Sequence, residues 1–152
     1  MCWEHAAALQ EQVLPAVEKK GGQLFFVGVG TAEAANEFAT QLGLPPSICF
    51  GDENGVVGDV LGLDQGFRTM WNPPAVDNMM ARNDQESLQR LGQAYKAAAD
   101  NIGIRQLAPK NVQDTLRQGG TFVFRGSQPL LEHFDAKVGD NCEIDEILAV
   151  LK

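Results

Sequence analysis

Cys2 is the residue of this sequence best placed for chemistry, because it directly precedes a predicted helix. The chain of 152 residues opens with Met1 and Cys2, and a helical pattern follows from Trp3 to Lys19. The free N–H groups and the positive dipole end of a helix start favour a thiolate and can lower a thiol pKa below roughly 8.5. We therefore predict Cys2 as the catalytic residue, either as a resolving thiol or as a nucleophile. The alternative interpretation is a small buried apolar residue or a frayed end.

The remaining thiols and the histidines are weaker candidates. Cys49 lies in a predicted strand and is expected in the core, with a role as resolving partner for Cys2 as the alternative. Cys142 precedes the last predicted helix, where we expect it at the surface and open to the same activation by a helix dipole. His5 either favours the Cys2 thiolate from the same helical turn or is an ordinary surface residue, and His133 is predicted to be structural.

Composition and charge describe one soluble domain over residues 1–152. Hydrophobic residues make up 44% and charged residues 21%, as in ordinary globular chains. The net charge of −8 repels phosphate backbones and anionic lipid, so we expect no nucleic-acid partner. No apolar run approaches the roughly 20 residues of a membrane span, and we expect no membrane insertion. Three cysteines are too few for a disulfide scaffold, which favours a reducing intracellular compartment.

Other motifs do not indicate a cofactor or a metal. Gly28 and Gly30 follow a predicted strand, but no third glycine completes a dinucleotide fingerprint. No phosphate loop, zinc spacing or nucleophile elbow is present. The carboxylates of Asp52, Glu53 and Asp59 are typical of solvated turns and helix ends, so we expect no cofactor and no metal site.

The first half of the chain predicts helix, strand and helix. The first helix has its stop at Gly21 and Gly22, and its apolar face is expected at Ala7, Leu9, Val13, Leu14 and Val17. Residues 23–29 form a near-continuous apolar run, which is typical of a strand covered on both faces. Thr31 is expected to cap a helix over residues 32–42 that ends at Gly43.

The second half predicts an insertion followed by a hairpin and a helix. Residues 47–50 indicate a short strand, and a short helix is expected around residues 57–61. Residues 64–118 are interpreted as a helical insertion, since residues 84–102 have helical spacing and no convincing strand is present. Its apolar stretch is either core or an exposed docking patch, and consists of Met70, Trp71, Met79 and Met80.

A two-residue turn is expected to join the last two strands. Gly126 and Ser127 separate apolar runs over residues 121–125 and 129–134, which is typical of a hairpin. The last helix is predicted over residues 143–151. The whole order is helix, strand, helix, insertion, strand, turn, strand and helix.

This order resembles the thioredoxin pattern without its opening strand. The sequence also resembles the peroxiredoxin-like 2 family, of the alkyl-hydroperoxide-reductase/thiol-specific-antioxidant group, in the stretches Met1 to Leu9, Val27 to Gly30, Gly119 to Phe124, Leu130 to His133 and Gly139-Asp140. The resemblance implies an α/β, thioredoxin-like three-layer fold, with a mixed sheet flanked by helices. Members carry a C-x-x-C pair, and Cys2 matches its second cysteine.

The resemblance implies thiol redox chemistry. Such a protein reduces peroxides or disulfides through the cysteine at the first helix, is reduced again by a thioredoxin-type partner, and uses no metal, haem or flavin. Cytoplasm or chloroplast stroma are the expected compartments. The alternative is a non-catalytic interaction module or a structural subunit of a larger complex. A small-ligand binder is a third hypothesis with no specific residue behind it.

Two departures from the family pattern shape these expectations. The strand that normally separates the strand of residues 23–29 from that of residues 121–124 is absent, so we expect a split sheet and a longer native polypeptide. Peroxiredoxins usually place an arginine three residues before the aromatic of the late strand, and this position is Gly119. Arg117 lies two residues away, which points a side chain elsewhere, so its role is not transferred.

Overall fold

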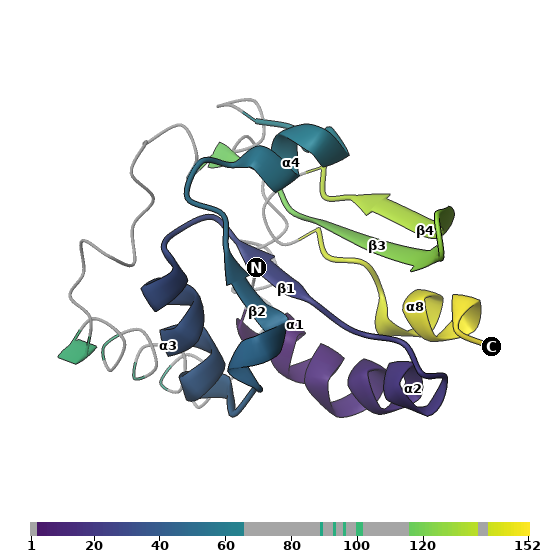
Figure 1. The fold of residues 1–152 in the computed structure, drawn as a ribbon, viewed down its shortest axis with the longest axis horizontal. Helices are drawn as coiled ribbons and strands as arrows, with labels where there is room; N and C mark the ends of the chain where they lie inside the picture. The colour runs from purple at the N-terminus through teal and green to yellow at the C-terminus, as the bar shows by residue number, and fades with distance from the viewer. Residues whose placement is uncertain are drawn as a thin grey trace.

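The computed structural model describes residues 3–65, 116–136 and 140–152, together with Gln89, Gln93, Lys96, Asp100 and Asn101. Within these residues the fold is α/β, as expected from the sequence, with helices alternating with short strands (Figure 1). The five single residues are helical and exposed. The apolar stretch of Met70, Trp71, Met79 and Met80 lies outside the described residues, as does most of the predicted helix over residues 84–102.

The first helical run contains a wide turn in its middle. It consists of α1 (Trp3–Ala8), the π-helical segment η1 (Leu9–Val13) and α2 (Leu14–Lys19). Pro15 lacks an N–H group and its ring crowds the preceding turn, and the helix accommodates it by an i to i+5 bond from the N–H of Leu14 to the carbonyl of Leu9. The run ends as predicted, because Gly21 has φ 69 and Gly22 donates to the carbonyl of Val17 at 3.0 Å.

The π turn also changes which side chains the first run buries. Its buried residues are Ala6, Leu9, Val13 and Val17. The prediction of Ala7 on this face is wrong, because Ala7 is exposed, and Leu14 is only half-buried. The wide turn brings residues spaced four apart onto one side, so Leu9, Val13 and Val17 align.

The first sheet is a short parallel pair. β1 (Phe26–Gly28) pairs with β2 (Cys49–Gly51), and α3 (Ala32–Leu42) and the 3₁₀ turn η2 (Pro46–Ile48) connect them. Thr31 caps α3 as predicted, with its hydroxyl accepting from the N–H of Ala34 at 3.2 Å. α3 packs against β2 (Figure 1).

The prediction that residues 23–29 form a strand covered on both faces is wrong. The strand spans only three residues, and Phe26 is its buried member. Phe25 and Val27 are 51% and 38% exposed. Side chains alternate across a strand, so the helices that cover Phe26 leave its neighbours on the open face.

The second sheet is the predicted hairpin. β3 (Gly120–Arg125) pairs antiparallel with β4 (Gln128–Phe134) around Gly126, which has φ 61. The register shifts between Val123 and Phe124, opposite Pro129, and a proline has no N–H to give to the ladder. α4 (Val56–Leu61) lies before the hairpin in the chain and α8 (Ile144–Val150) lies after it.

The described strands form two separate sheets of two strands each, β1-β2 and β3-β4. The single mixed sheet implied by the resemblance is therefore not formed among them, and the arrangement agrees with the expectation of a split sheet. α8 packs against η1 and β4, which ties the hairpin to the first helical run. The buried core is Ala6, Leu9, Val13, Val17, Phe26, Ala39, Leu44, Cys49, Cys142 and Ile147. In the part of the chain that is described, every helix is too short or too polar to cross a membrane.

Candidate functional site

The described part of the first helix begins one residue after Cys2. α1 starts at Trp3, and Cys2 itself lies outside the described residues, so its role stays a prediction. His5, in the first turn of α1, is half-buried instead of fully at the surface. Its Nε2 is buried without a hydrogen-bond partner, and burial lowers the pKa of its imidazole below 6.5. His5 is therefore a neutral ring at neutral pH.

A polar cluster lies where β4 ends and α8 begins. We call it the β4–α8 cluster and define it as His133, Asp135, Asp140, Cys142 and Glu146. The Nε2 atom of His133 lies 3.0 Å from the carbonyl oxygen of Asp140 and 3.4 Å from Oδ1 of Asp135. The Sγ atom of Cys142 lies 3.6 Å from Oε2 of Glu146. One ligand atom from each of His133, Cys142 and Glu146 lies within 4.8 Å of the other two. His133 thus has the structural contacts predicted for it.

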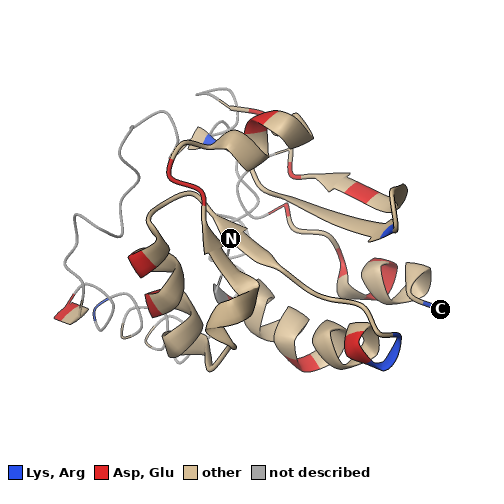
Figure 2. Cartoon of the chain, in the orientation of Figure 1, with Lys and Arg blue, Asp and Glu red and all other residues tan. Residues whose placement is uncertain are grey.

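Cys142 is not the exposed, activated thiol that its position before a helix predicts. It is 1% exposed and belongs to the hydrophobic core. Burial, with a further contribution from the carboxylate of Glu146, raises the pKa of its thiol to about 11. The residues at the start of α8 are acidic, as Figure 2 shows, and the negative charges of Glu143 and Glu146 also raise the pKa of the Cys142 thiol.

Asp135 fills the space that a side chain at position 119 would take. A Cβ atom added to Gly119 would lie 2.5 Å from Oδ2 of Asp135, and the N–H of Asp135 donates to the Gly119 carbonyl at 3.1 Å. Burial raises the pKa of the Asp135 carboxyl to about 6, against the lowering effect of His133. The position where peroxiredoxins usually carry an arginine therefore faces an acid.

Arg117 is bound to α4. Its side chain is 6% exposed, and its Nη1 lies 2.8 Å from Oδ1 of Asp59. The Arg117 side chain packs against Gly55 and Gly58, where an added Cβ would come within 2.9 Å of Nη2 and 2.6 Å of Cδ, respectively. Arg117 is thus a structural residue of the α4 region. This agrees with the expectation that Arg117 does not take the role of the peroxiredoxin arginine. Asp59 is exposed, as expected, but it is also the ion-pair partner of Arg117.

Asp52 and Cys49 have structural roles close to those predicted. The two carboxylate oxygens of Asp52 accept from the N–H groups of Val56 at 3.0 Å and Val57 at 2.7 Å, which caps the start of α4. Cys49 is buried in β2, and burial raises the pKa of its thiol. A thiol of this kind is a poor nucleophile at neutral pH.

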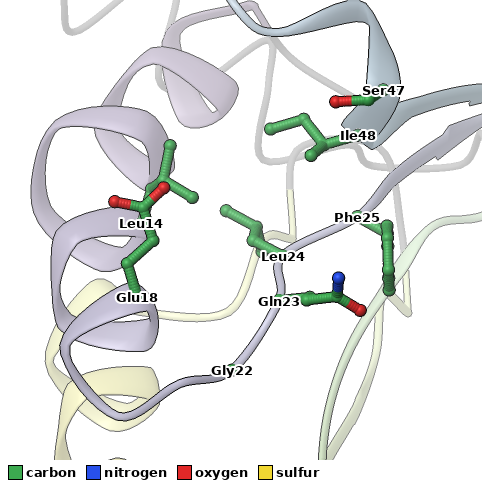
Figure 3. Close-up of a pocket in the computed structure, with 8 residues that line it drawn as sticks. All are labelled: Leu14, Glu18, Gly22, Gln23, Leu24, Phe25, Ser47 and Ile48. Carbon is green, nitrogen blue, oxygen red and sulfur yellow. The ribbon is translucent and has the colours of Figure 1, made fainter.

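A shallow pocket lies between α2 and the segment leading into β1. Figure 3 shows the apolar side chains of Leu14, Leu24, Phe25 and Ile48 on its walls and the carboxylate of Glu18 at its rim. Its walls carry no thiol, histidine or pair of acids. The described residues that line this pocket therefore offer no thiol nucleophile and no acid–base pair.

The described helices and strands define an α/β protein. The family model of the AhpC/TSA antioxidant enzymes matches residues 8–137, and the chain belongs to this family. Of the three cysteines the match spans only Cys49. Neither a curated protein nor a solved structure gave a significant match.

The β4–α8 cluster is not predicted from the sequence as a unit. Zinc motifs are usually recognised by paired cysteines or histidines at short spacing, and His133, Cys142 and Glu146 do not have this pattern. The available signal is Cys142 and Glu146 at positions i and i+4, which places them on one side of a starting helix. Their short distance to His133 depends on the loop after β4 and cannot be predicted from the spacing of these residues in the sequence.

Proposed function

We propose that this protein is a peroxiredoxin-like thiol redox protein that reduces peroxides or disulfides through Cys2. The observation that carries the proposal is the helical run that begins at Trp3, immediately after Cys2 in the sequence, in a chain of the AhpC/TSA family. A thiolate at a helix start is stabilised by the free N–H groups of the first turn. The neutral ring of His5 in that turn adds no cation at neutral pH, so the helix start supplies the main stabilisation.

With a peroxide as substrate, the proposed reaction is a two-electron oxidation of Cys2. The Cys2 thiolate attacks one peroxide oxygen, the O–O bond breaks, and the other oxygen leaves as water or an alcohol after taking a proton. Cys2 becomes a sulfenic acid. A dithiol reductant of the thioredoxin type then forms a mixed disulfide with release of water, and its second thiol frees Cys2 as a thiol. We place this chemistry in a reducing compartment, cytoplasm or chloroplast stroma.

We also infer that the two sheets belong to a thioredoxin-like layered fold. The parallel β1-β2 pair connected through α3, followed later by an antiparallel hairpin and a closing helix, has the order typical of that fold. The family membership supports the same inference. An additional strand between β1 and β3 would join the two sheets into one mixed sheet.

A second candidate is a non-catalytic interaction or structural subunit with this fold, acting within a larger complex. It is favoured by Asp135, whose carboxylate fills the space at Gly119 where an arginine would polarise a peroxide. Arg117, the nearest basic residue in the chain, is engaged by Asp59.

Peroxide-dependent oxidation of a thioredoxin system by the full-length protein distinguishes the two. We expect turnover in the wild type, its loss in Cys2→Ser, and its retention in the matched control Cys49→Ser, since Cys49 is buried. A sulfenic-acid reagent applied after peroxide should label Cys2. Absence of turnover in the wild type, with no adduct on Cys2, would favour the non-catalytic subunit, whereas equal turnover in wild type and Cys2→Ser would remove Cys2 from the mechanism.

A further inference from the structure

The β4–α8 cluster collects three kinds of metal-ligating atom in one place. It offers an imidazole nitrogen from His133, a thiol sulfur from Cys142 and a carboxylate oxygen from Glu146, all within 4.8 Å of one another. These residues come from two elements, β4 and the start of α8, that are adjacent in the fold. Nitrogen, sulfur and oxygen donors together suit a borderline ion such as Zn²⁺ better than Mg²⁺ or Ca²⁺.

The distances within the cluster are close to those between ligands on one ion. Ligand bonds to zinc of about 2.0 to 2.3 Å place two tetrahedral ligands roughly 3.5 Å apart. Cys142 Sγ and Glu146 Oε2 are 3.6 Å apart, and all three ligand atoms of His133, Cys142 and Glu146 lie within 4.8 Å of one another. A shift of about 1 Å would close the remaining separations around a single ion.

Two further observations point to a ligand. Oδ1 of Asp135 is buried and has no hydrogen-bond partner, which leaves a desolvated oxygen beside His133. The Asp140 carbonyl can only accept, so His133 Nε2 carries the hydrogen in that contact and Nδ1 presents its lone pair in the neutral ring. Glu146 has Cys142 as its polar partner among the described residues and forms no ion pair with them.

We propose that the β4–α8 cluster is a zinc site, with His133, Cys142 and Glu146 as its three protein ligands and water in the fourth position. Binding breaks the S–H bond of Cys142, the proton passes to the buffer, and a sulfur–zinc bond forms without any change of oxidation state. The ion would link the end of β4 to the start of α8 through its ligands. It is separate from the peroxide chemistry proposed for Cys2 and stands or falls independently of it.

Titration of the metal-free, reduced full chain with Co²⁺ and then Zn²⁺ tests the site. We expect one Co²⁺ per chain with a thiolate-to-cobalt charge-transfer band and the d–d bands of a tetrahedral ion, displaced by one Zn²⁺. Cys142→Ser should lose the charge-transfer band, and Cys2→Ser should keep it. The reverse pattern, or a spectrum without thiolate coordination, would overturn the proposal.

Glu146 and its acidic neighbour Asp145 on α8 provide a matched pair of variants for measuring Zn²⁺ affinity. Glu146→Gln and Asp145→Asn each remove one charge from adjacent exposed positions, so neither threatens the fold. We expect Glu146→Gln to weaken Zn²⁺ binding roughly tenfold or more, and Asp145→Asn to leave it unchanged. Zn²⁺ should raise the unfolding temperature of wild type and Asp145→Asn more than that of Glu146→Gln. Equal Zn²⁺ affinities in the two variants would show that Glu146 is not a zinc ligand and that the cluster is a hydrogen-bonded network.

Discussion

At the scale of residues, burial decides which side chains keep their expected reactivity. Cys142 stands before a helix, yet burial and the neighbouring carboxylate raise the pKa of its thiol to about 11, so position alone does not activate it. Asp135 next to Gly119 shows the same effect in a carboxyl group, whose pKa rises to about 6. A helix start therefore lowers the pKa of a thiol only where the side chain remains near solvent and away from acidic groups.

His5 gives a prediction for the pH dependence of stability. The unfolded chain protonates this histidine near pH 6.5, whereas burial lowers its pKa in the folded state. Between these values the unfolded state binds more protons, so the free energy of unfolding should fall as the pH decreases through this window. Urea unfolding of wild type and His5→Gln at several pH values measures it. As the pH falls below 6.5, the wild type should lose stability relative to His5→Gln, since only the wild type protonates this histidine on unfolding. The opposite effect of Asp135 is present in both proteins and cancels in the comparison.

Variants of Arg117 and Asp59 separate the contributions of packing and ion pairing to the free energy of unfolding. Its side chain is 6% exposed, whereas that of Asp59 is 67% exposed, so the pair is screened by water on one side. We expect Asp59→Asn to cost less than about 1 kcal/mol of unfolding free energy. Arg117→Ala should cost roughly 1 to 3 kcal/mol, since it also removes the packing against Gly55 and Gly58. Equal losses in chemical denaturation would make the ion pair the main contribution.

At the scale of elements, local signals set the ends of helices and long-range contacts set the strands. Thr31 caps the start of α3 and Gly21 follows the end of the first helical run, both as the sequence predicts, because caps depend on neighbouring residues. β1 is shorter and more exposed than its apolar run suggests, since burial of a strand depends on what covers it. The π turn before Pro15 also shifts the buried face of the first helix, which a fixed helical period does not anticipate.

The pairing of β1 with β2 gives a matched prediction for two glycines. Gly28 and Gly51 are register partners, but an added Cβ at Gly51 would overlap the carbonyl of Thr31, whereas at Gly28 it would meet open space. Backbone cannot move aside as a flexible side chain does. We expect Gly51→Ala to lose roughly 1 to 3 kcal/mol in urea unfolding and Gly28→Ala to stay close to wild type. Similar stabilities for both would show that the loop before α3 yields easily.

At the scale of the whole molecule, the fold class could be predicted and the site could not. The order of elements and the hairpin around Gly126 follow from alternating apolar runs and turn residues, which are local. The β4–α8 cluster brings His133 to Cys142 and Glu146 across a loop, and its chemistry depends on distances that no spacing rule provides. The prediction of Cys2 rests on the sequence, because the family match begins at residue 8 and Cys2 lies outside the described residues, so its test is chemical.

The two-sheet arrangement predicts self-association of this 152-residue polypeptide. Among the described residues β1 pairs only with β2 and β3 only with β4, so each has an edge without a described partner, and Val27 and Phe124 are exposed on these strands. Open edges with apolar side chains recruit further strands, and a lysine on such an edge opposes this. We expect sedimentation velocity to show concentration-dependent association in the wild type and less in Val27→Lys, although the net charge of −8 limits it in both. Lys20→Ala, outside the strands, serves as the control and should associate as the wild type does. A wild type that remains monomeric at all concentrations and unfolds in one sharp transition would show that these edges are already covered.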